Sequence, residues 1–528
     1  MSTSKKITNN SKKVDVSTKS AKHKLSFISI MLITVGTCIG AGIFYKNSSI
    51  LNNNEGDLYL SIFSWVIAIV GILAMAYTLN DLYCGSKKYE TLGFVGWVRV
   101  FNGEALYKGL KNFMVLIYLS TNFFFMPYYA VQSLQDASGF FTGNSEFPIW
   151  VIILVAFIIM LWFTIIPTFS LKYGNVQNSA TLFIKFIPVV FIVIVGIIIS
   201  FPNAGASVSS ITNVQENDAP STFIRTCMGF GVIASIPAIF FAFDGFYSAA
   251  GLVEEAKKPE KNPLALALGL SIVSAVYVIL SIVFLVSGTG SIFGFANFYD
   301  NKAWSITLGI VSICICISAC GVINGIAIYG ISFCKDLLSR NDAPFKKFFK
   351  FFWRKKNGFA GFYTLTIYFV SFTIFSLIGL FYIPNGIYDI YGSGASRLYS
   401  LCDIISNWTA LFAFISIGLA ILSCLINKKT KRIVYKTPKQ RKWLFITSAI
   451  ISVTIIFIST IYLYVECFYN FFSFLITYLN GTDINNFFDD YLLPQIITLI
   501  LLIVFTMCIF GPFLLQGTKK IAKKLFLR

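Results

Sequence analysis

The chain has 528 residues, of which 56% are hydrophobic and only 12% are charged, with a formal net charge of +19. A soluble protein of this length needs many more charged residues to cover its surface, so the composition excludes ordinary soluble domains. Apolar runs of about 20 residues recur along the chain, the length that crosses a hydrocarbon core about 30 Å thick as a helix. We therefore expect an integral membrane protein.

In chain order, the apolar runs predict twelve transmembrane helices. The first six lie near 26–46, 58–79, 112–134, 149–168, 179–200 and 222–251. The other six lie near 264–288, 303–333, 360–382, 402–426, 443–465 and 495–516. The spans are predicted as helices because backbone groups in lipid must be hydrogen-bonded within their own segment.

Lysine and arginine are distributed asymmetrically between the two sides of these spans. With the N-terminus in the cytoplasm, the cytoplasmic segments hold 37 of the 42 Lys and Arg residues. The outer side keeps Lys46, Arg225, Lys302 and Arg397. Lys185 alone is expected well inside a span. The positive-inside rule thus predicts a multi-pass protein of the plasma membrane with both termini in the cytoplasm.

The remaining composition argues against several other functions. The basic stretch 346–356 is expected to meet anionic lipid headgroups, so membrane lipid is a partner and nucleic acid is not. The only histidine, His23, precedes the first span, and no Gly-rich phosphate-binding loop followed by Lys-Ser/Thr occurs. We expect no metal and no cofactor, and the protein is not expected to be an enzyme.

The first span contains an unusual concentration of glycine. The segment 36–44 reads Gly-Thr-Cys-Ile-Gly-Ala-Gly-Ile-Phe, and each mid-helix glycine weakens a helix by about 1 kcal/mol relative to alanine. Small residues allow close helix packing, which is one interpretation. The other is an unwound segment whose free N–H and C=O groups bind a ligand.

The sixth span favours the second interpretation. Its segment 240–250 places Asp244 beside Gly245, deep in an aromatic run. A carboxylate at this depth is costly unless it faces a cavity or a partner. The first and sixth spans enter from opposite sides, as expected of an inverted repeat with its site at the midplane.

These motifs resemble those of the amino acid–polyamine–organocation superfamily. The segment 36–44 is similar to the family's helix 1 signature, G-x-x-x-G-x-G-I-F. The segment 240–263 resembles its helix 6 and the following loop, with Glu254-Glu255 as the paired acids. The segment 324–344 is similar to helix 8 and the A-R-D-G-x-x-P motif after it, although this chain has Ser-Arg-Asn-Asp in place of the family's usual residues. The resemblance covers helices 1 to 10.

The resemblance implies an all-α membrane protein of the LeuT type. Two inverted five-helix repeats would occupy 26–200 and 222–426, and helices 11 and 12 would lie within 443–516. From composition and charge we expect a disordered basic cytoplasmic tail over 1–25 and a basic cytoplasmic tail over 517–528.

The resemblance also implies which groups bind a substrate. The substrate carboxylate would meet backbone N–H groups of helix 1, and its ammonium would meet carbonyls there and at the helix 6 break. The physics agrees, because helix N-termini attract anions and helix C-termini offer acceptors. The expected substrate-binding residues are Cys38, Ile39, Gly40, Ala41, Gly42, Phe241, Phe243 and Asp244.

Two charged residues carry open alternatives. The resemblance implies that the Lys185 ammonium replaces the sodium ion of sodium-coupled relatives, whereas a lysine near a helix end can also snorkel to the headgroups. Asp244 faces either the cavity or a helix-packing partner.

We therefore expect a secondary active transporter that moves amino acids by alternating access. Proton coupling, with protons as partners, and exchange both remain open. A polyamine or organic-cation transporter is the alternative on the same fold, and a membrane sensor or assembly subunit is the alternative outside transport. The stretch 467–494 is expected to form an amphipathic hairpin at the outer surface.

Overall fold

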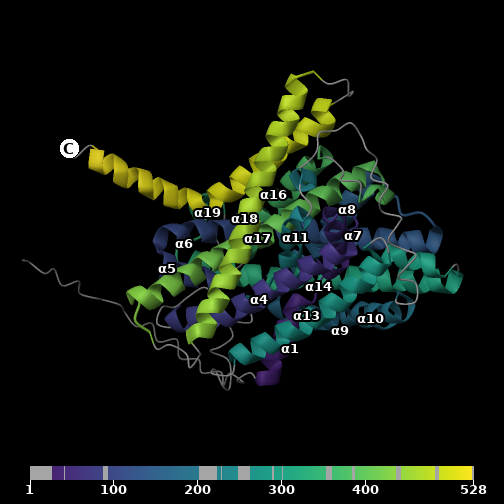
Figure 1. The fold of residues 1–528 in the computed structure, drawn as a ribbon, viewed down its shortest axis with the longest axis horizontal. Coiled ribbons are helices and arrows are strands. Elements are labelled where there is room, and N and C mark those ends of the chain that lie inside the picture. Colours follow the sequence, from purple (N-terminus) through teal and green to yellow (C-terminus); the bar gives the residue numbers. More distant parts are fainter. Residues whose placement is uncertain are drawn as a thin grey trace, which may run out of the picture.

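The computed structural model describes residues 26–40, 42–86, 93–200, 223–226, 229–247, 262–287, 290–299, 301–352, 359–382, 387–435, 442–481 and 487–525. Within these residues every regular element is helical (Figure 1). Ala41 and the paired acids predicted at Glu254 and Glu255 lie outside the described residues.

The elements before residue 201 form the first group. They are α1 (Phe27–Cys38), α2 (Gly42–Tyr45), α3 (Asn47–Asn53), α4 (Leu58–Ser86), α5 (Gly93–Asn102), α6 (Glu104–Phe113), the π-helix η1 (Met114–Tyr118), α7 (Leu119–Thr142), α8 (Ile149–Phe169), α9 (Leu171–Ile184) and α10 (Phe186–Ser200).

The second group follows residue 222. Its elements are η3 (Phe223–Thr226), α11 (Phe230–Ala242), α13 (Asn262–Val286), η6 (Ile292–Phe298), α14 (Lys302–Ser339), α15 (Lys346–Phe352), α16 (Phe359–Leu380), η7 (Asp389–Tyr391), α17 (Ser393–Thr430), α18 (Lys442–Leu479), η8 (Phe488–Leu492) and α19 (Leu493–Leu525).

Each of the predicted spans overlaps one or more helices. Among the described residues, ten helices are long and apolar enough to cross a membrane, and the bent pair of 30–45 with α3 brings the number to eleven. The sixth predicted span is represented by α11, a shorter apolar helix. The prediction of an all-α membrane protein is confirmed.

The buried centre of the bundle is built around α7 and α17. Helix α14 packs along α7, and α17 packs against α7, α11 and α18. The side chains at 410–414 in α17 are all fully buried. By contrast, α8 exposes Trp150, Leu154, Ile158 and Trp162, a stripe at i+4 spacing that suits contact with lipid.

Several helices extend beyond the predicted spans. Helix α18 has 38 residues, which corresponds to about 57 Å at 1.5 Å per residue and exceeds the hydrocarbon thickness. Its end forms a helical hairpin with η8, where Phe474 stacks on Phe487 and Tyr491. This hairpin rises at the top of Figure 1.

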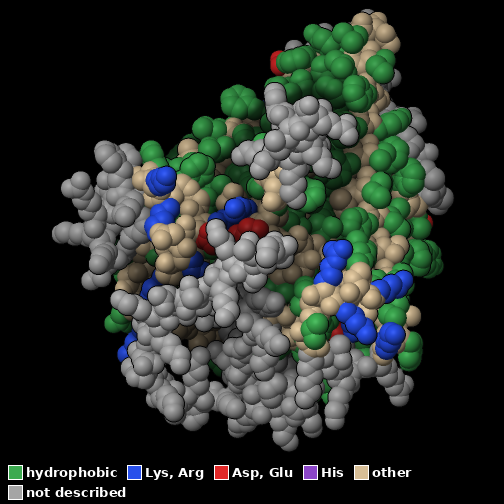
Figure 2. Space-filling view, turned by 90° about the vertical axis from the view of Figure 1, so that its left-hand side faces the viewer, with side chains coloured by type: hydrophobic (Ala, Val, Ile, Leu, Met, Phe, Trp, Pro, Cys, Tyr) green, Lys and Arg blue, Asp and Glu red, His purple; other side chains and the backbone are tan. Residues whose placement is uncertain are grey.

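The surface is divided by side-chain type. Figure 2 shows hydrophobic side chains over the upper part of one face, whereas Lys and Arg side chains gather lower down.

Candidate functional site

The first span is interrupted where its glycines lie. Helix α1 ends at Cys38, Ile39 and Gly40 are not helical, and α2 begins at Gly42. The chain changes direction a second time after Tyr45, where α3 is bent by 55° relative to the segment 30–45. The interruption predicted near Gly40 is therefore present.

The sixth span is interrupted at Asp244. Helix α11 ends at Ala242, and a turn covers 243–245. Gly245 has φ +97°, a conformation that residues with a Cβ rarely adopt. The glycine after Asp244 is thus what allows the chain to turn at this point.

The two interruptions lie directly against each other. A Cβ atom on Gly42 would lie 2.7 Å from Ala242 Cα, so only glycine permits this backbone contact. Tyr277, on α13, donates its hydroxyl proton either to Cys38 O at 2.6 Å or to Ala242 O at 3.2 Å. Tyr277 therefore ties the end of α1 to the end of α11, a role that no local sequence pattern indicates.

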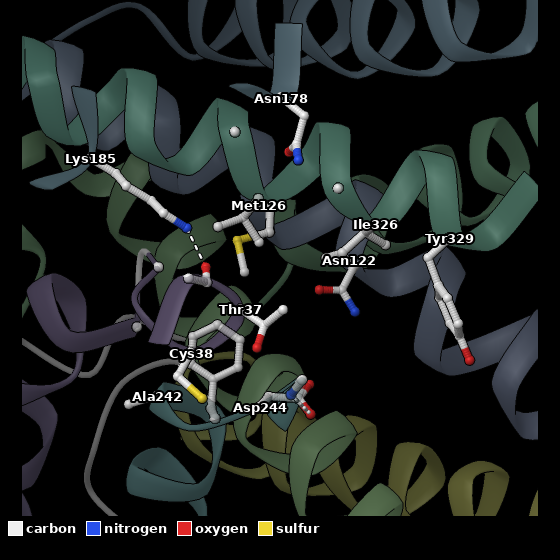
Figure 3. A pocket seen from close by; sticks show the side chains of 18 of the residues that line it. Thr37, Cys38, Asn122, Met126, Asn178, Lys185, Ala242, Asp244, Ile326 and Tyr329 are labelled. Atoms are coloured by element: carbon white, nitrogen blue, oxygen red, sulfur yellow. Dashed lines mark hydrogen bonds between the residues drawn. The ribbon is translucent and has the colours of Figure 1, made fainter. Parts of the chain in front are cut away.

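A cavity of about 500 Å³ lies where the interruptions meet (Figure 3); we call it the central cavity. Five of the predicted substrate-binding residues line it: Cys38, Gly40, Gly42, Phe241 and Asp244. Other lining residues, absent from the sequence-based set, include Thr37, Tyr118, Asn122, Met126, Asn178, Thr181, Tyr247, Gly321, Gly325 and Tyr329.

Two predicted residues have side chains that do not line the cavity. Ile39 is 2% exposed and belongs to the hydrophobic core. Phe243 is fully buried and packs on the ring of Tyr277, with ring centroids 5.0 Å apart. The resemblance implied a role for the backbone carbonyls at these two positions, and that role stays a prediction, because the apolar packing concerns only the side chains.

Asp244 combines both roles considered from the sequence, since it lines the cavity and is held by neighbouring helices. Its Oδ2 accepts a hydrogen bond from Tyr118 at 2.7 Å. Its Oδ1 lies 2.9 Å from both the Tyr247 hydroxyl and the Gly245 N–H. Several donors thus surround the carboxylate and fix its orientation at the cavity wall.

Lys185 reaches the opposite side of the break. It forms the junction between α9 and α10, where Pro188 cannot donate a backbone hydrogen bond to Ile184. Its side chain is largely buried, and its Nζ donates to the carbonyl oxygen of Gly36 in α1 (Figure 3). The central cavity therefore has an ammonium group on one side and a carboxylate on the other.

Lys46 is also fully buried, so Lys185 is not the only lysine inside the helix bundle, whereas the placement of Lys46 on the outer side stays a prediction. Its Nζ lies 2.6 Å from Asp403 Oδ1 and 2.7 Å from Ser406 Oγ, both on α17. It also donates to Tyr129 at 3.0 Å. The apolar run ends at Lys46, so hydropathy predicted the end of the span there. In the structure α3 follows directly, and Lys46 is surrounded by packed helices.

The Lys46–Asp403 pair belongs to a layer that closes one end of the central cavity. Phe241 lines the cavity, and its ring centroid lies 4.7 Å from Lys46 Nζ. Beyond Lys46, as seen from the central cavity, the ring of Tyr45 stacks on the ring of Tyr129, with centroids 4.7 Å apart. We call Tyr45, Lys46, Tyr129, Phe241 and Asp403 the septum.

Solved structures share this fold. Two crystal structures of a manganese transporter from Eremococcus coleocola, a mutant and a complex with an aromatic bis-isothiourea substituted compound, match with TM-scores of 0.53 and 0.52. Each match covers 92% of this chain and 94% of that chain at 13% identity. The fold is that of a LeuT-type membrane transporter.

The sequence comparison identifies the family. A model described as amino acid permease matches residues 25–472, and the chain belongs to the amino acid permease family. An uncharacterized protein of Mycoplasma pneumoniae is 36% identical over 497 residues, which cover 86% of each chain.

Relatives with named substrates are more distant. The serine/threonine exchanger SteT of Bacillus subtilis is 25% identical over 311 residues, 58% of this chain and 65% of SteT. The arginine/ornithine antiporter ArcD2 of Lactococcus lactis is 23% identical over 277 residues, 49% of this chain and 53% of ArcD2. These matches span about half to two thirds of the named transporters.

Proposed function

We propose that the protein is a secondary transporter that moves amino acids across the plasma membrane by alternating access. The observation that carries this proposal is the central cavity of about 500 Å³, which lies where two interrupted helices meet. A transporter requires polar groups at such interruptions, whereas a scaffold or sensor does not. Relatives named as exchangers or antiporters of amino acids support the substrate class.

An amino acid would be held by complementary charges at the two interruptions. The first N–H groups of α2, beginning at Gly42, have no intrahelical partners and suit the substrate carboxylate. We assign the substrate ammonium to the Asp244 carboxylate, because Asp244 is the acidic residue of the central cavity, whereas Cys38 O and Ala242 O are neutral acceptors that lie within hydrogen-bonding distance of the Tyr277 hydroxyl. This pose needs both charged groups of the amino acid.

The conformation suits a state that is open on the cytoplasmic side. The lining of the central cavity extends from Gly42 back along α1 to Leu32, whose side chain is 58% exposed. The septum closes the opposite end. With the N-terminus in the cytoplasm, as the lysine and arginine distribution indicates, the cavity opens inward and the septum is the outer barrier.

The proposed role of Lys185 is to hold the interruption of α1 with its ammonium group. Its hydrogen bond to Gly36 O places an ammonium where a metal cation would otherwise satisfy a carbonyl oxygen. Because an ammonium can lose its proton, Lys185 also permits proton coupling. Exchange needs no proton transfer and requires only that the barrier stays closed while the substrate site is empty.

Uptake into proteoliposomes tests the function. The purified protein is supplied with a panel of radiolabelled amino acids under three conditions: no gradient, an inward proton gradient, and unlabelled internal substrate. We expect uptake above protein-free liposomes, with stimulation by the gradient for symport or by internal substrate for exchange. No uptake of any amino acid under all three conditions would refute the proposal.

Competition by amines separates amino acids from the alternative substrate class. Because the pose uses the carboxylate, decarboxylated amines and polyamines should compete weakly against the parent amino acid. Equal competition by a matching amine would replace the proposal with an organic-cation transporter that uses Asp244 as its ammonium partner.

A further inference from the structure

A second cavity of about 500 Å³ lies beyond the septum. Tyr45 lines it, while the stacked Tyr129 belongs to the same septum as Phe241 of the central cavity. The proposed amino acid site does not use this second cavity. Its chemistry is therefore a separate question.

One face of the third span connects the two cavities. Tyr118, Asn122 and Met126 line the central cavity at steps of four residues. Tyr129 belongs to the septum, and Gln132 and Asp136 line the second cavity at further steps of three and four. Steps of three and four keep residues on one helical face, so a single stripe borders both cavities.

Asp136 brings an acidic side chain to the second cavity. It is the only charged side chain among the described residues that line this cavity, and it is 6% exposed. It takes part in none of the ion pairs between described residues. Its Oδ1 accepts a hydrogen bond from Tyr391 at 2.6 Å, and a buried carboxylate with no cationic partner is costly.

Gln132 supplies an acceptor beside this carboxylate. Tyr391 gives its only hydroxyl proton to Asp136, so the Tyr391 oxygen must accept from Gln132 Nε2, 3.2 Å away. This arrangement fixes the amide orientation. Gln132 is 6% exposed, and its Oε1 is buried with no hydrogen-bond partner among the described residues.

We propose that the second cavity binds an organic cation through a guanidinium or ammonium group. The Asp136 carboxylate supplies the counter-charge, Gln132 Oε1 accepts a hydrogen bond, and aromatic rings such as those of Tyr45 and Phe293 provide faces that attract a cation. A planar guanidinium suits this combination best, because it donates several hydrogen bonds and stacks on aromatic rings. The site is independent of the amino acid site in the central cavity.

Cysteine protection in the purified full-length protein tests this proposal. Ile390 lines the second cavity and is 50% exposed, so Ile390→Cys can be labelled with a fluorescent maleimide over the background of the parent protein. The probe is n-butylguanidinium, and its neutral control is n-butylurea. Both lack the carboxylate that the proposed amino acid site requires.

We expect n-butylguanidinium to slow the labelling of Ile390→Cys at a concentration about tenfold or more below that of n-butylurea, because only the cation forms charge-assisted hydrogen bonds. Asn144→Cys, an exposed position outside the lining, should label at the same rate with either compound. Asp136→Asn should remove the difference between the compounds, and Gln132→Met should reduce it. Asp244→Asn, in the central cavity, should leave it intact.

Equal protection by n-butylurea, or a difference that survives Asp136→Asn, would overturn the proposal. So would protection by sodium ions at the concentration at which n-butylguanidinium protects, because the ligand would then be inorganic. If Asp136→Asn does not fold, Gln132→Met decides the outcome, since an unchanged difference there also overturns the proposal. Amino acid uptake is measured separately, so its failure would leave this result interpretable.

Discussion

Two lysine–aspartate ion pairs, one inside the bundle and one at a loop, show how burial changes the contribution of an ion pair to stability. In the septum, Lys46 Nζ lies 2.6 Å from Asp403, and the two side chains are 0% and 8% exposed. At the loop after α14, Lys111 Nζ lies 3.0 Å from Asp342, with exposures of 10% and 30%. Water can therefore replace part of the second contact but not the first.

The two pairs share two kinds of neighbour. Lys46 lies 5.4 Å from the ring centroid of Tyr129, and Lys111 lies 5.7 Å from that of Tyr107. A tyrosine hydroxyl also joins each pair, at Lys46 in the septum and at Asp342 in the loop. The septum pair has further contacts, with Ser406 Oγ and the ring of Phe241, so its substitution should report these contacts together with burial. The septum is the more costly of the two contacts to break.

Asp403→Asn should give the largest loss of stability. Without the carboxylate, Lys46 remains buried beside a neutral amide, and breaking a buried pair in this way typically costs about 3–5 kcal/mol. Unfolding of the purified protein in detergent would measure the loss. We also expect transport to fail, because the barrier between the cavities would lose its central contact.

A double substitution sharpens this test. Lys46→Met combined with Asp403→Leu removes both charges and should recover stability to within about 1 kcal/mol of the parent, because apolar groups can replace a buried pair. If Asp403→Asn unfolds as the parent does, the septum pair does not stabilise the fold.

Lys185→Ala should abolish transport with a smaller effect on stability. The ammonium has only the Gly36 carbonyl as a hydrogen-bond acceptor among the described residues, so removing it also removes the cost of burying a charge. Uptake and unfolding are measured on the same preparation. Lys172→Ala, at an exposed position on α9, is the matched control and should transport normally. Normal uptake by Lys185→Ala would exclude its proposed role.

Tyr277→Phe should lower the free energy of unfolding by about 1–3 kcal/mol. The substitution keeps the ring but leaves the buried carbonyls of Cys38 and Ala242 without this donor. Ser271→Ala, an exposed hydroxyl on the same helix, is the control and should change stability by less than about 0.5 kcal/mol. An equal effect of both substitutions would show that Tyr277 does not tie the interruptions together.

The fold could be predicted because its signals are local. Apolar runs indicate spans wherever backbone must be satisfied inside lipid, and the glycines at 36–42 and Gly245 mark places where a helix weakens. Lys185 stood out for the same reason, as a charge in the middle of an apolar run. Such features need only a window of neighbouring residues.

The septum and the second cavity could not be predicted because their partners are distant in sequence. Lys46 and Asp403 are separated by 357 positions, and each lies at the edge of a predicted span, where a charge usually meets water. Asp136 follows the predicted end of the third span, yet α7 continues to Thr142. Only the packing of α7, α14 and α17 brings these residues into buried positions.

Asp342→Asn should give the smallest effect, below about 1 kcal/mol at neutral pH, because the pair is partly exposed to water. Burial alone would raise the pKa of Asp342, but the hydrogen bond and charge of Lys111 outweigh burial and hold the pKa below its ordinary value of 3.8. The lowered pKa means that this stabilisation is present above pH 3.8 and is lost as the pH falls further. Unfolding at neutral pH and below pH 3.8 should therefore show a difference between parent and Asp342→Asn that shrinks on acidification. A difference at neutral pH as large as that of Asp403→Asn would contradict the conclusion that burial separates the two pairs.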